Sequence, residues 1–409
     1  MDKDEVAVQL HESLGKVEPH PLDHEAIVAR AGKRRRRRIG TAGAALSLLA
    51  AAVAAVAILG GPSEGPLGPP TVEASARVAL PGEVVGAGDQ VVGAAAAEGD
   101  YLWVLTCSRR CGGPPSNFEH SQDTLVKVDS GSGAIVARTP VEGAGVVAVG
   151  EGGVWTAGYD GTVTHYDPQT GKALSSVHLL LPKPVCTDCS ETEALAFLPN
   201  GIVVGEGAVW VSTAREYIAQ IDPRTTEVVR MLPTPGGVYG MALAGGSLSY
   251  SVGLFGVGRI DAATGDREPP RPIADAEGRE LQLDYLAVAD GSLWARGAWG
   301  PPRGTHKYVP HPGGDLSLAR LDPQTGRVEQ MVSFNNYIWV HAVSGPHLWL
   351  ASRDSRAGSR NVYAVSAGSG KVELAARLAE SGTIVGAVGT SLWVARPGDV
   401  LERYDVPIG

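Results

Sequence analysis

The stretch from Val154 to Lys172 reads VWTAGYDGTVTHYDPQTGK and contains the unit that the rest of the chain repeats. Two short apolar runs flank an Asp-Gly pair, which predicts a β-hairpin. The Asp-Pro-Gln-Thr-Gly segment behind it predicts a second tight turn, because Asp accepts local backbone hydrogen bonds, Pro presets φ and Gly adopts positive φ. We therefore expect four antiparallel strands, around Val147–Val149, Val154–Thr156, Val163–Tyr166 and Lys172–Val177.

The unit returns at regular intervals down the chain. A tryptophan, replaced once by serine, starts each hairpin at Trp103, Trp155, Trp210, Ser249, Trp294, Trp349 and Trp393. An acidic turn position, also replaced once by serine, follows at Asp129, Asp167, Asp222, Asp261, Asp322, Ser366 and Asp405. The repeat length is about 39 residues, which is typical of a propeller blade. The pattern predicts an all-β protein, a seven-bladed β-propeller of four-stranded blades. We expect the aspartates to form turns and the tryptophans to pack between blades.

The seventh unit contains only three of its four strands, which predicts how the ring closes. These strands are Ile384–Val388, Leu392–Ala395 and Val400–Tyr404. Val72–Pro81 resembles the missing strand, since its Leu-Pro ending repeats that of an earlier fourth strand. We expect this N-terminal strand to complete the last blade, because pairing there covers an open sheet edge.

On these residues the chain resembles the bacterial YVTN-type and pyrroloquinoline-quinone-type (PQQ-like) β-propeller repeat proteins, and more distantly the virginiamycin B lyase-like propellers. The resemblance covers about residues 71–409 and implies a fold that hosts binding, scaffolding and catalysis alike. No tryptophan follows Thr-Gly-Lys at Lys172, as it does in quinone dehydrogenase repeats. No stretch matches the histidine-containing metal site of the lyase. The prediction is therefore no cofactor and no metal.

The N-terminal part has the pattern of a membrane anchor. Lys33–Arg38 is a run of six basic residues, and Ile39–Leu59 carries no charge. Twenty-one residues at about 1.5 Å each match the hydrocarbon core of a bilayer, and basic flanks stay in the cytoplasm. The predicted domains are a cytoplasmic tail (1–38), a transmembrane helix (39–61), a Gly/Pro linker (62–70) and an extracytoplasmic propeller (71–409). The predicted location is the cell membrane, crossed once. The main alternative is a cleaved signal peptide, which normally has a shorter apolar region.

The net charge bears on the class of partner, and the cysteines bear on disulfide formation. The net charge is −9, and from residue 62 onward 26 Lys/Arg stand against 37 Asp/Glu, which argues against a nucleic-acid partner. Outside the cell, thiols tend to oxidise, which favours disulfides over a four-thiolate zinc site. The pairing stays open, within each close pair or across the two, among Cys107, Cys111, Cys186 and Cys189.

Long connections are expected to meet on one face of the ring and to form a binding surface there. They are Cys107–Ser121, Leu181–Gly201, Ala298–Asp315 and Asp354–Ser359. Cationic and aromatic residues in two of them favour an anionic or carbohydrate-like ligand, or an acid-rich protein. The candidate binding residues are Arg109, Arg110, His120, Trp299, Arg303, His306 and His311.

Three functions are compatible with this pattern. The leading hypothesis is a membrane-anchored binding or scaffold module with an unknown protein or small-molecule ligand. The alternative is a lyase or hydrolase that uses His306 or His311 with an acid such as Glu191 or Glu193. Neither Gly-x-Ser-x-Gly, His-Glu-x-x-His nor a phosphate-binding loop is present to favour catalysis. A purely structural envelope component is the third possibility.

Overall fold

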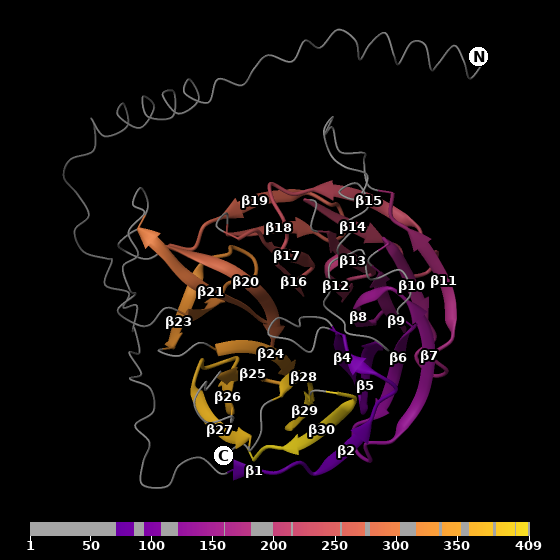
Figure 1. The fold of residues 1–409 in the computed structure, drawn as a ribbon. Coiled ribbons are helices and arrows are strands. Elements are labelled where there is room, and N and C mark those ends of the chain that lie inside the picture. Colours follow the sequence, from indigo (N-terminus) through magenta and orange to yellow (C-terminus); the bar gives the residue numbers. More distant parts are fainter. Residues whose placement is uncertain are drawn as a thin grey trace, which may run out of the picture. The chain divides into compact units, whose positions relative to one another are not determined.

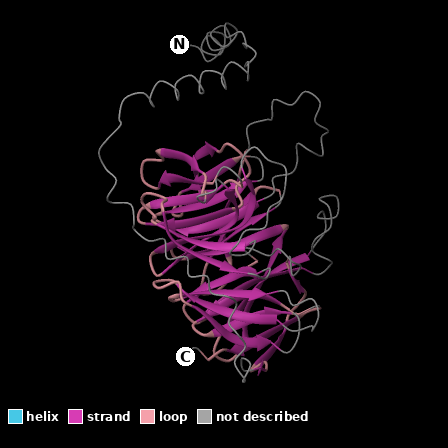
Figure 2. Cartoon of the chain, turned by 90° about the vertical axis from the view of Figure 1, so that its left-hand side faces the viewer, coloured by secondary structure: helices cyan, strands magenta, loops and turns pink. Residues whose placement is uncertain are grey.

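A computed structural model of the protein describes residues 71–85, 94–107, 122–158, 160–180, 199–213, 216–253, 256–274, 279–302, 316–334, 338–352, 360–378, 382–396 and 398–407. Within these ranges the chain forms β-strands joined by turns and contains no helix (Figure 2). The predicted all-β class is therefore confirmed for the part that the structure describes.

Seven sheets hold the strands, and we number them as blades in chain order. Blade one contains β4 (Ala95–Glu98), β5 (Tyr101–Cys107), β6 (Gln122–Asp129) and β7 (Ile135–Glu142). Blade two contains β8 (Ala144–Gly150), β9 (Gly153–Gly158), β10 (Thr162–Tyr166) and β11 (Ala173–His178). Blade three contains β12 (Pro199–Gly205), β13 (Ala208–Thr213), β14 (Tyr217–Ile221) and β15 (Val228–Pro233). Blade four contains β16 (Gly240–Ala244), β17 (Ser247–Ser251), β18 (Val257–Asp261) and β19 (Arg267–Arg271).

The remaining blades follow the same order. Blade five contains β20 (Arg279–Ala289), β21 (Ser292–Pro302), β22 (Leu316–Leu321) and β23 (Val328–Phe334). Blade six contains β24 (Ile338–Ser344), β25 (His347–Ser352), β26 (Arg360–Ser366) and β27 (Val372–Leu378). Blade seven contains β28 (Thr383–Val388), β29 (Ser391–Ala395), β30 (Val400–Asp405) and β2 (Ala76–Ala79). We call the four strands of a blade A to D, from the ring centre outward.

The blades close into a ring around a central axis (Figure 1). Their A strands contact one another in cyclic order, from β4 through β8, β12, β16, β20, β24 and β28 back to β4. Because the last contact joins blade seven to blade one, the seven-bladed propeller predicted from the repeat is confirmed.

The predicted closure is also confirmed, with one difference in extent. Strand β2 pairs antiparallel with β30, and Val78 lies opposite Leu401. Val72, however, belongs to a separate strand, β1 (Thr71–Val72), which pairs parallel with β27 of blade six. The N-terminal segment therefore pairs with two neighbouring blades, first with blade six at Thr71–Val72 and then with blade seven at Ala76–Ala79. A third short strand, β3 (Glu83–Val84), pairs with β5 of blade one.

Tryptophan fills the space between blades. All six repeat tryptophans within the ring are at most 1% exposed, and each lies on a B strand. Trp155 packs with residues of blade three, and Trp349 packs with residues of blade seven, so each indole faces the following blade. The indole N–H has no acceptor among the described residues for Trp155, Trp210, Trp294, Trp349 and Trp393. These side chains therefore stabilise the ring through the packing of their apolar faces.

The two faces of the ring differ in how the strands are connected. Each A–B connection has two residues, and those of blades two, three, four and five have positive φ at both, as at Glu151 (50°) and Gly152 (74°). Such angles match the tight turns that join twisted strands. The C–D turns share this face, which we call the turn face, and the described turns line the left side of the strands in Figure 2. The B–C and D–A connections leave from the opposite face, the loop face.

A polar side chain on the C strand links most blades to the next one. It lies opposite the tryptophan position and donates to a carbonyl in the C–D turn of the following blade, as Lys127 Nζ does to Pro168 O over 2.7 Å. Gln220 donates to Ala262 O over 3.0 Å. The same contact is made by Arg259 to Gln324 O, Arg320 to Gly368 O, and Arg403 to Ser130 O. We call these contacts blade clamps, and the Arg403 clamp joins blade seven to blade one.

A buried polar cluster supports the closing strand. Glu402 on β30 is 3% exposed and accepts from Arg396 over 2.5 Å, from Tyr404 over 2.6 Å and from Arg77 of β2 over 2.9 Å. Burial opposes ionisation of Glu402, but these hydrogen bonds and the two arginine charges outweigh it and lower its pKa. Burial and the Glu402 contact raise the pKa of Tyr404 to about 12. The closing strand is therefore held by an ionised carboxylate as well as by its backbone.

The described residues include no helix that is long and apolar enough to cross a membrane. The apolar stretch Ile39–Leu59, the tail before it and the linker after it lie outside the described residues. The predicted anchor and topology therefore stay predictions.

Candidate functional site

The long connections of this propeller leave from the loop face. The strand bounds leave 14 residues between β5 and β6, 20 between β11 and β12, and 13 between β21 and β22. On the turn face, every A–B connection has two residues and every C–D turn has five or six. A scaffold with one uniform face and one variable face is typical of proteins whose binding residues lie on loops.

Most of the sequence-predicted binding residues lie in these connections. Arg109, Arg110, His120, Arg303, His306 and His311 are outside the described residues, as are Glu191 and Glu193. Trp299 is the exception and lies on β21, where it is 7% exposed. Its indole N–H donates to Ser317 Oγ over 2.9 Å. Trp299 therefore packs into blade five, and little of its ring is open to solvent.

The cysteines are described at one position only. Cys107 is the last residue of β5 and is 4% exposed. Its sulfur is not a free thiol, but Cys111, Cys186 and Cys189 lie outside the described residues. The pairing scheme therefore stays a prediction.

A partly buried ion pair lies in the hairpin that leads to residues 303–315. Asp284 sits at a β-bulge in β20, and its Oδ2 accepts from Arg296 Nη2 over 2.8 Å. The Arg296 side chain is 2% exposed. Burial raises the pKa of Asp284 although the Arg296 charge acts against it, and burial raises the pKa of Tyr285 to about 12. This pair fixes the long β20–β21 hairpin at its bulge.

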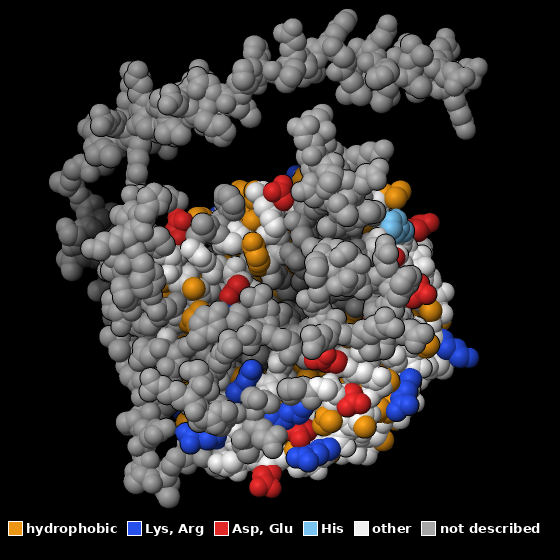
Figure 3. All heavy atoms as spheres, in the orientation of Figure 1, with side chains coloured by type: hydrophobic (Ala, Val, Ile, Leu, Met, Phe, Trp, Pro, Cys, Tyr) orange, Lys and Arg blue, Asp and Glu red, His pale blue; other side chains and the backbone are white. Residues whose placement is uncertain are grey.

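Basic side chains gather on part of the loop face. Figure 3 shows Lys and Arg, with Asp and Glu among them, over the sheets of β26, β27 and β30. Arg360 is the first residue of β26 and Arg377 is near the end of β27, and both side chains are partly exposed. Arg396, which directly follows β29, is buried against Glu402. Since Arg360 and Arg377 lie at strand ends on the loop face, blade six presents cationic groups there within an acidic protein.

A second candidate site lies at the junction of blades four and five. Ser249 occupies the position that holds tryptophan in the other six blades, and it is 2% exposed. A cavity of about 20 Å³ lies beside it, lined among others by Arg259, Leu293 and Gln324. The missing indole is therefore not fully replaced by neighbouring side chains.

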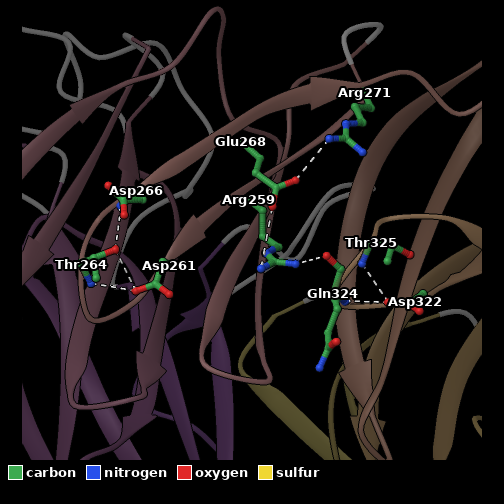
Figure 4. Close-up of polar contacts among 9 residues, drawn as sticks. All are labelled: Arg259, Asp261, Thr264, Asp266, Glu268, Arg271, Asp322, Gln324 and Thr325. Carbon is green, nitrogen blue, oxygen red and sulfur yellow. Dashed lines mark hydrogen bonds and ion pairs between the residues drawn. The ribbon is translucent and has the colours of Figure 1, made fainter.

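Charged groups surround this cavity (Figure 4). Arg259 lies opposite Ser249 in the sheet and donates to the Gln324 carbonyl of blade five. Its Nη2 is 3.9 Å from Glu268, and Arg271 is 3.4 Å from the same carboxylate. Asp261 and Asp322 lie at the C–D turns of blades four and five, where backbone and side-chain N–H and O–H groups hydrogen-bond to them and lower their pKa.

The recurring aspartates have the structural role that was predicted. Asp322 Oδ1 accepts from the backbone N–H of Gln324 over 2.7 Å and of Thr325 over 2.8 Å. The equivalent contacts recur at Asp167 and Asp261. The blade clamps, by contrast, were not predicted from the sequence. A simple signal marks them, because each donor is a polar or basic residue two positions before an acidic turn position.

The comparisons with known proteins support the fold alone. No family model matches this chain, and no curated protein matches it. Among solved structures, it is similar to a chain in the crystal structure of the mitotic checkpoint complex, with a TM-score of 0.56 and 12% identity. The match covers 90% of this chain and 100% of that one. As 1441 solved chains match, the fold is widespread and does not select a function by itself.

Proposed function

We propose that this protein is a binding or scaffold module, a propeller held outside the cell by a single N-terminal membrane span. It binds a protein or another ligand through its loop face. The observation that carries this proposal is the contrast between the two faces, with the long connections leaving from the loop face. Propellers commonly serve as protein-binding modules, and the similar chain noted above belongs to a protein complex.

The charge distribution suggests the chemistry of the partner. Arg360 and Arg377, at the loop-face strand ends of blade six, belong to the same face from which the connection with the predicted binding residues Arg303, His306 and His311 leaves. A partner with acidic groups fits this surface, because opposite charges steer association and fix its orientation. Oxidised cysteines would fit the extracytoplasmic location, since disulfides persist there.

In-cell photo-crosslinking tests the binding surface. A benzophenone amino acid replaces Leu180, which follows β11 on the loop face and is 80% exposed, or Arg224, in a turn on the opposite face. The Arg224 side chain is 86% exposed, so it is a matched control for accessibility. The proposal predicts a discrete crosslinked product from position 180 and none from 224. Products from 224 alone, or none from a series of loop-face positions, would contradict it.

Protease protection tests the topology separately. Protease added to intact cells should digest the chain beyond about residue 62 and leave a tagged N-terminus intact. Protection of the whole chain until the cells are opened would refute the extracytoplasmic location without affecting the loop-face proposal.

A further inference from the structure

The repeat itself shows what is unusual at the junction of blades four and five. Six equivalent positions hold a buried tryptophan, and the seventh holds Ser249. In blades one and two, the polar side chain opposite that position lies against the ring. Lys127 Nζ is 5.4 Å from the centroid of Trp103, and His165 stacks on Trp155 at 4.1 Å with 2° between the planes. Blade four retains the cation, Arg259, but has no ring beneath it.

We propose that this vacancy, the 249 slot, binds a flat aromatic group that takes the place of the missing indole between blades four and five. The slot is defined by Ser249, Val257, Arg259, Leu293 and Pro323. The slot is formed by strand and turn residues of blades four and five, and it runs from Pro323 in the C–D turn of blade five toward Val257 and Arg271 at the ends of β18 and β19. The inference therefore does not depend on the proposed function.

The walls of the slot suit an aromatic ring. Leu293, Val257 and Pro323 supply apolar surface, and Arg259 and Arg271 supply guanidinium groups that favour the face of a ring. The indole N–H of five repeat tryptophans lacks an acceptor, so this type of slot selects for the ring rather than for a polar group on it. Phenyl, phenol and indole groups all belong to the expected class.

The aromatic group can enter the slot when the Arg259 side chain moves aside. The cavity beside Ser249 measures about 20 Å³, which is room for one water. Arg259 covers the slot with its side chain 27% exposed, and its ion-pair partner Glu268 is 48% exposed. An outward rotation of the guanidinium gives up its contact with the Gln324 carbonyl, exposes the slot and leaves the charge over the incoming ring. The pair Glu268 and Arg271 lies at the rim, where it remains solvated.

The direct test measures binding of N-acetyl-tryptophanamide to the full chain in detergent by saturation-transfer NMR, with N-acetyl-leucinamide as the aliphatic control. We expect binding of the aromatic compound only. Ser249→Trp should weaken it at least about tenfold by filling the slot and should raise the melting temperature. Leu174→Ser, at an exposed position on β11 of blade two, should leave binding unchanged. Arg259→Met should weaken binding about two- to thirty-fold, as expected for loss of a cation–π contact.

Two further arms separate the outcomes. A short peptide with one central tryptophan binds more tightly than the amide if the natural ligand is a side chain of a partner protein, and equally if it is a free aromatic compound. If Ser249→Trp fails to fold, Ser249→Phe and Arg259→Met decide the question in its place. Absence of aromatic binding to the natural chain overturns the proposal, and so does equal binding to the filled variants. The slot would then be a packing defect covered by Arg259.

Discussion

Replacing Trp210 by serine would create a second vacancy of the same kind and so tests the packing account directly. Trp210 is fully buried and packs with Met241, Leu248 and Tyr250 of blade four. Large-to-small changes at such positions cost about 3–5 kcal/mol, from lost burial and the cavity left behind. A propeller of about 340 residues unfolds with an entropy near 0.7 kcal/mol per kelvin. The expected fall in melting temperature is therefore about 4–7 °C.

Two control variants make this measurement specific. Leu174→Ser lies on outer strand β11, where the side chain is 58% exposed, and should shift the melting temperature by less than about 1 °C. Trp210→Phe keeps an aromatic ring and loses an N–H that has no acceptor, so its effect should be less than half that of serine. Differential scanning calorimetry at one scan rate compares all four proteins. A Trp210→Ser variant that melts within 1 °C of the natural protein would refute the reasoning.

Three other predictions concern the closure, the clamps and the cysteines. Glu402→Gln should lower the melting temperature at pH 7, and the deficit should shrink as the pH falls below 4.5, the ordinary pKa of this carboxyl. The sign follows because a lowered pKa stabilises the fold only while the group is ionised; a deficit that is constant with pH contradicts it. Arg403→Met should lower the melting temperature more than Arg224→Met, because Arg403 joins blade seven to blade one and Arg224 is 86% exposed. Equal shifts would show that the clamp contributes nothing. Peptide mapping without reductant should recover Cys107 in a disulfide with one of the other three cysteines, and its recovery as a free thiol would be the contrary result.

The repeat made much of the fold predictable, because tryptophan and the Asp-Pro-x-Thr-Gly turn each have one strong local meaning. Trp103 and Trp393 lie where the spacing put them, and Asp167 and Asp322 form the expected turns. Strand β1 could not be predicted, because a two-residue strand has no periodicity and its partner, β27, is distant in sequence.

The candidate site was harder to predict than the fold. The substitution at Ser249 is visible in the sequence, yet only packing shows that its neighbours leave a cavity there. Trp299 has the composition of a ligand contact, but its depth in blade five depends on the long β20–β21 hairpin. The sequence identified the connections that leave the loop face, since their lengths follow from the repeat, whereas the positions of their side chains depend on contacts that no local pattern specifies.

The closing strand gives the most direct test of the whole account, because the seven-bladed ring depends on β2 completing blade seven. Hydrogen–deuterium exchange of the segment Val400–Asp405 should be compared in the full chain and in a chain that lacks residues 71–80. The account predicts slow exchange in the full chain and fast exchange after the deletion, together with a sharp fall in melting temperature. Equal protection of β30 in both proteins would contradict closure of the ring by the N-terminal strand.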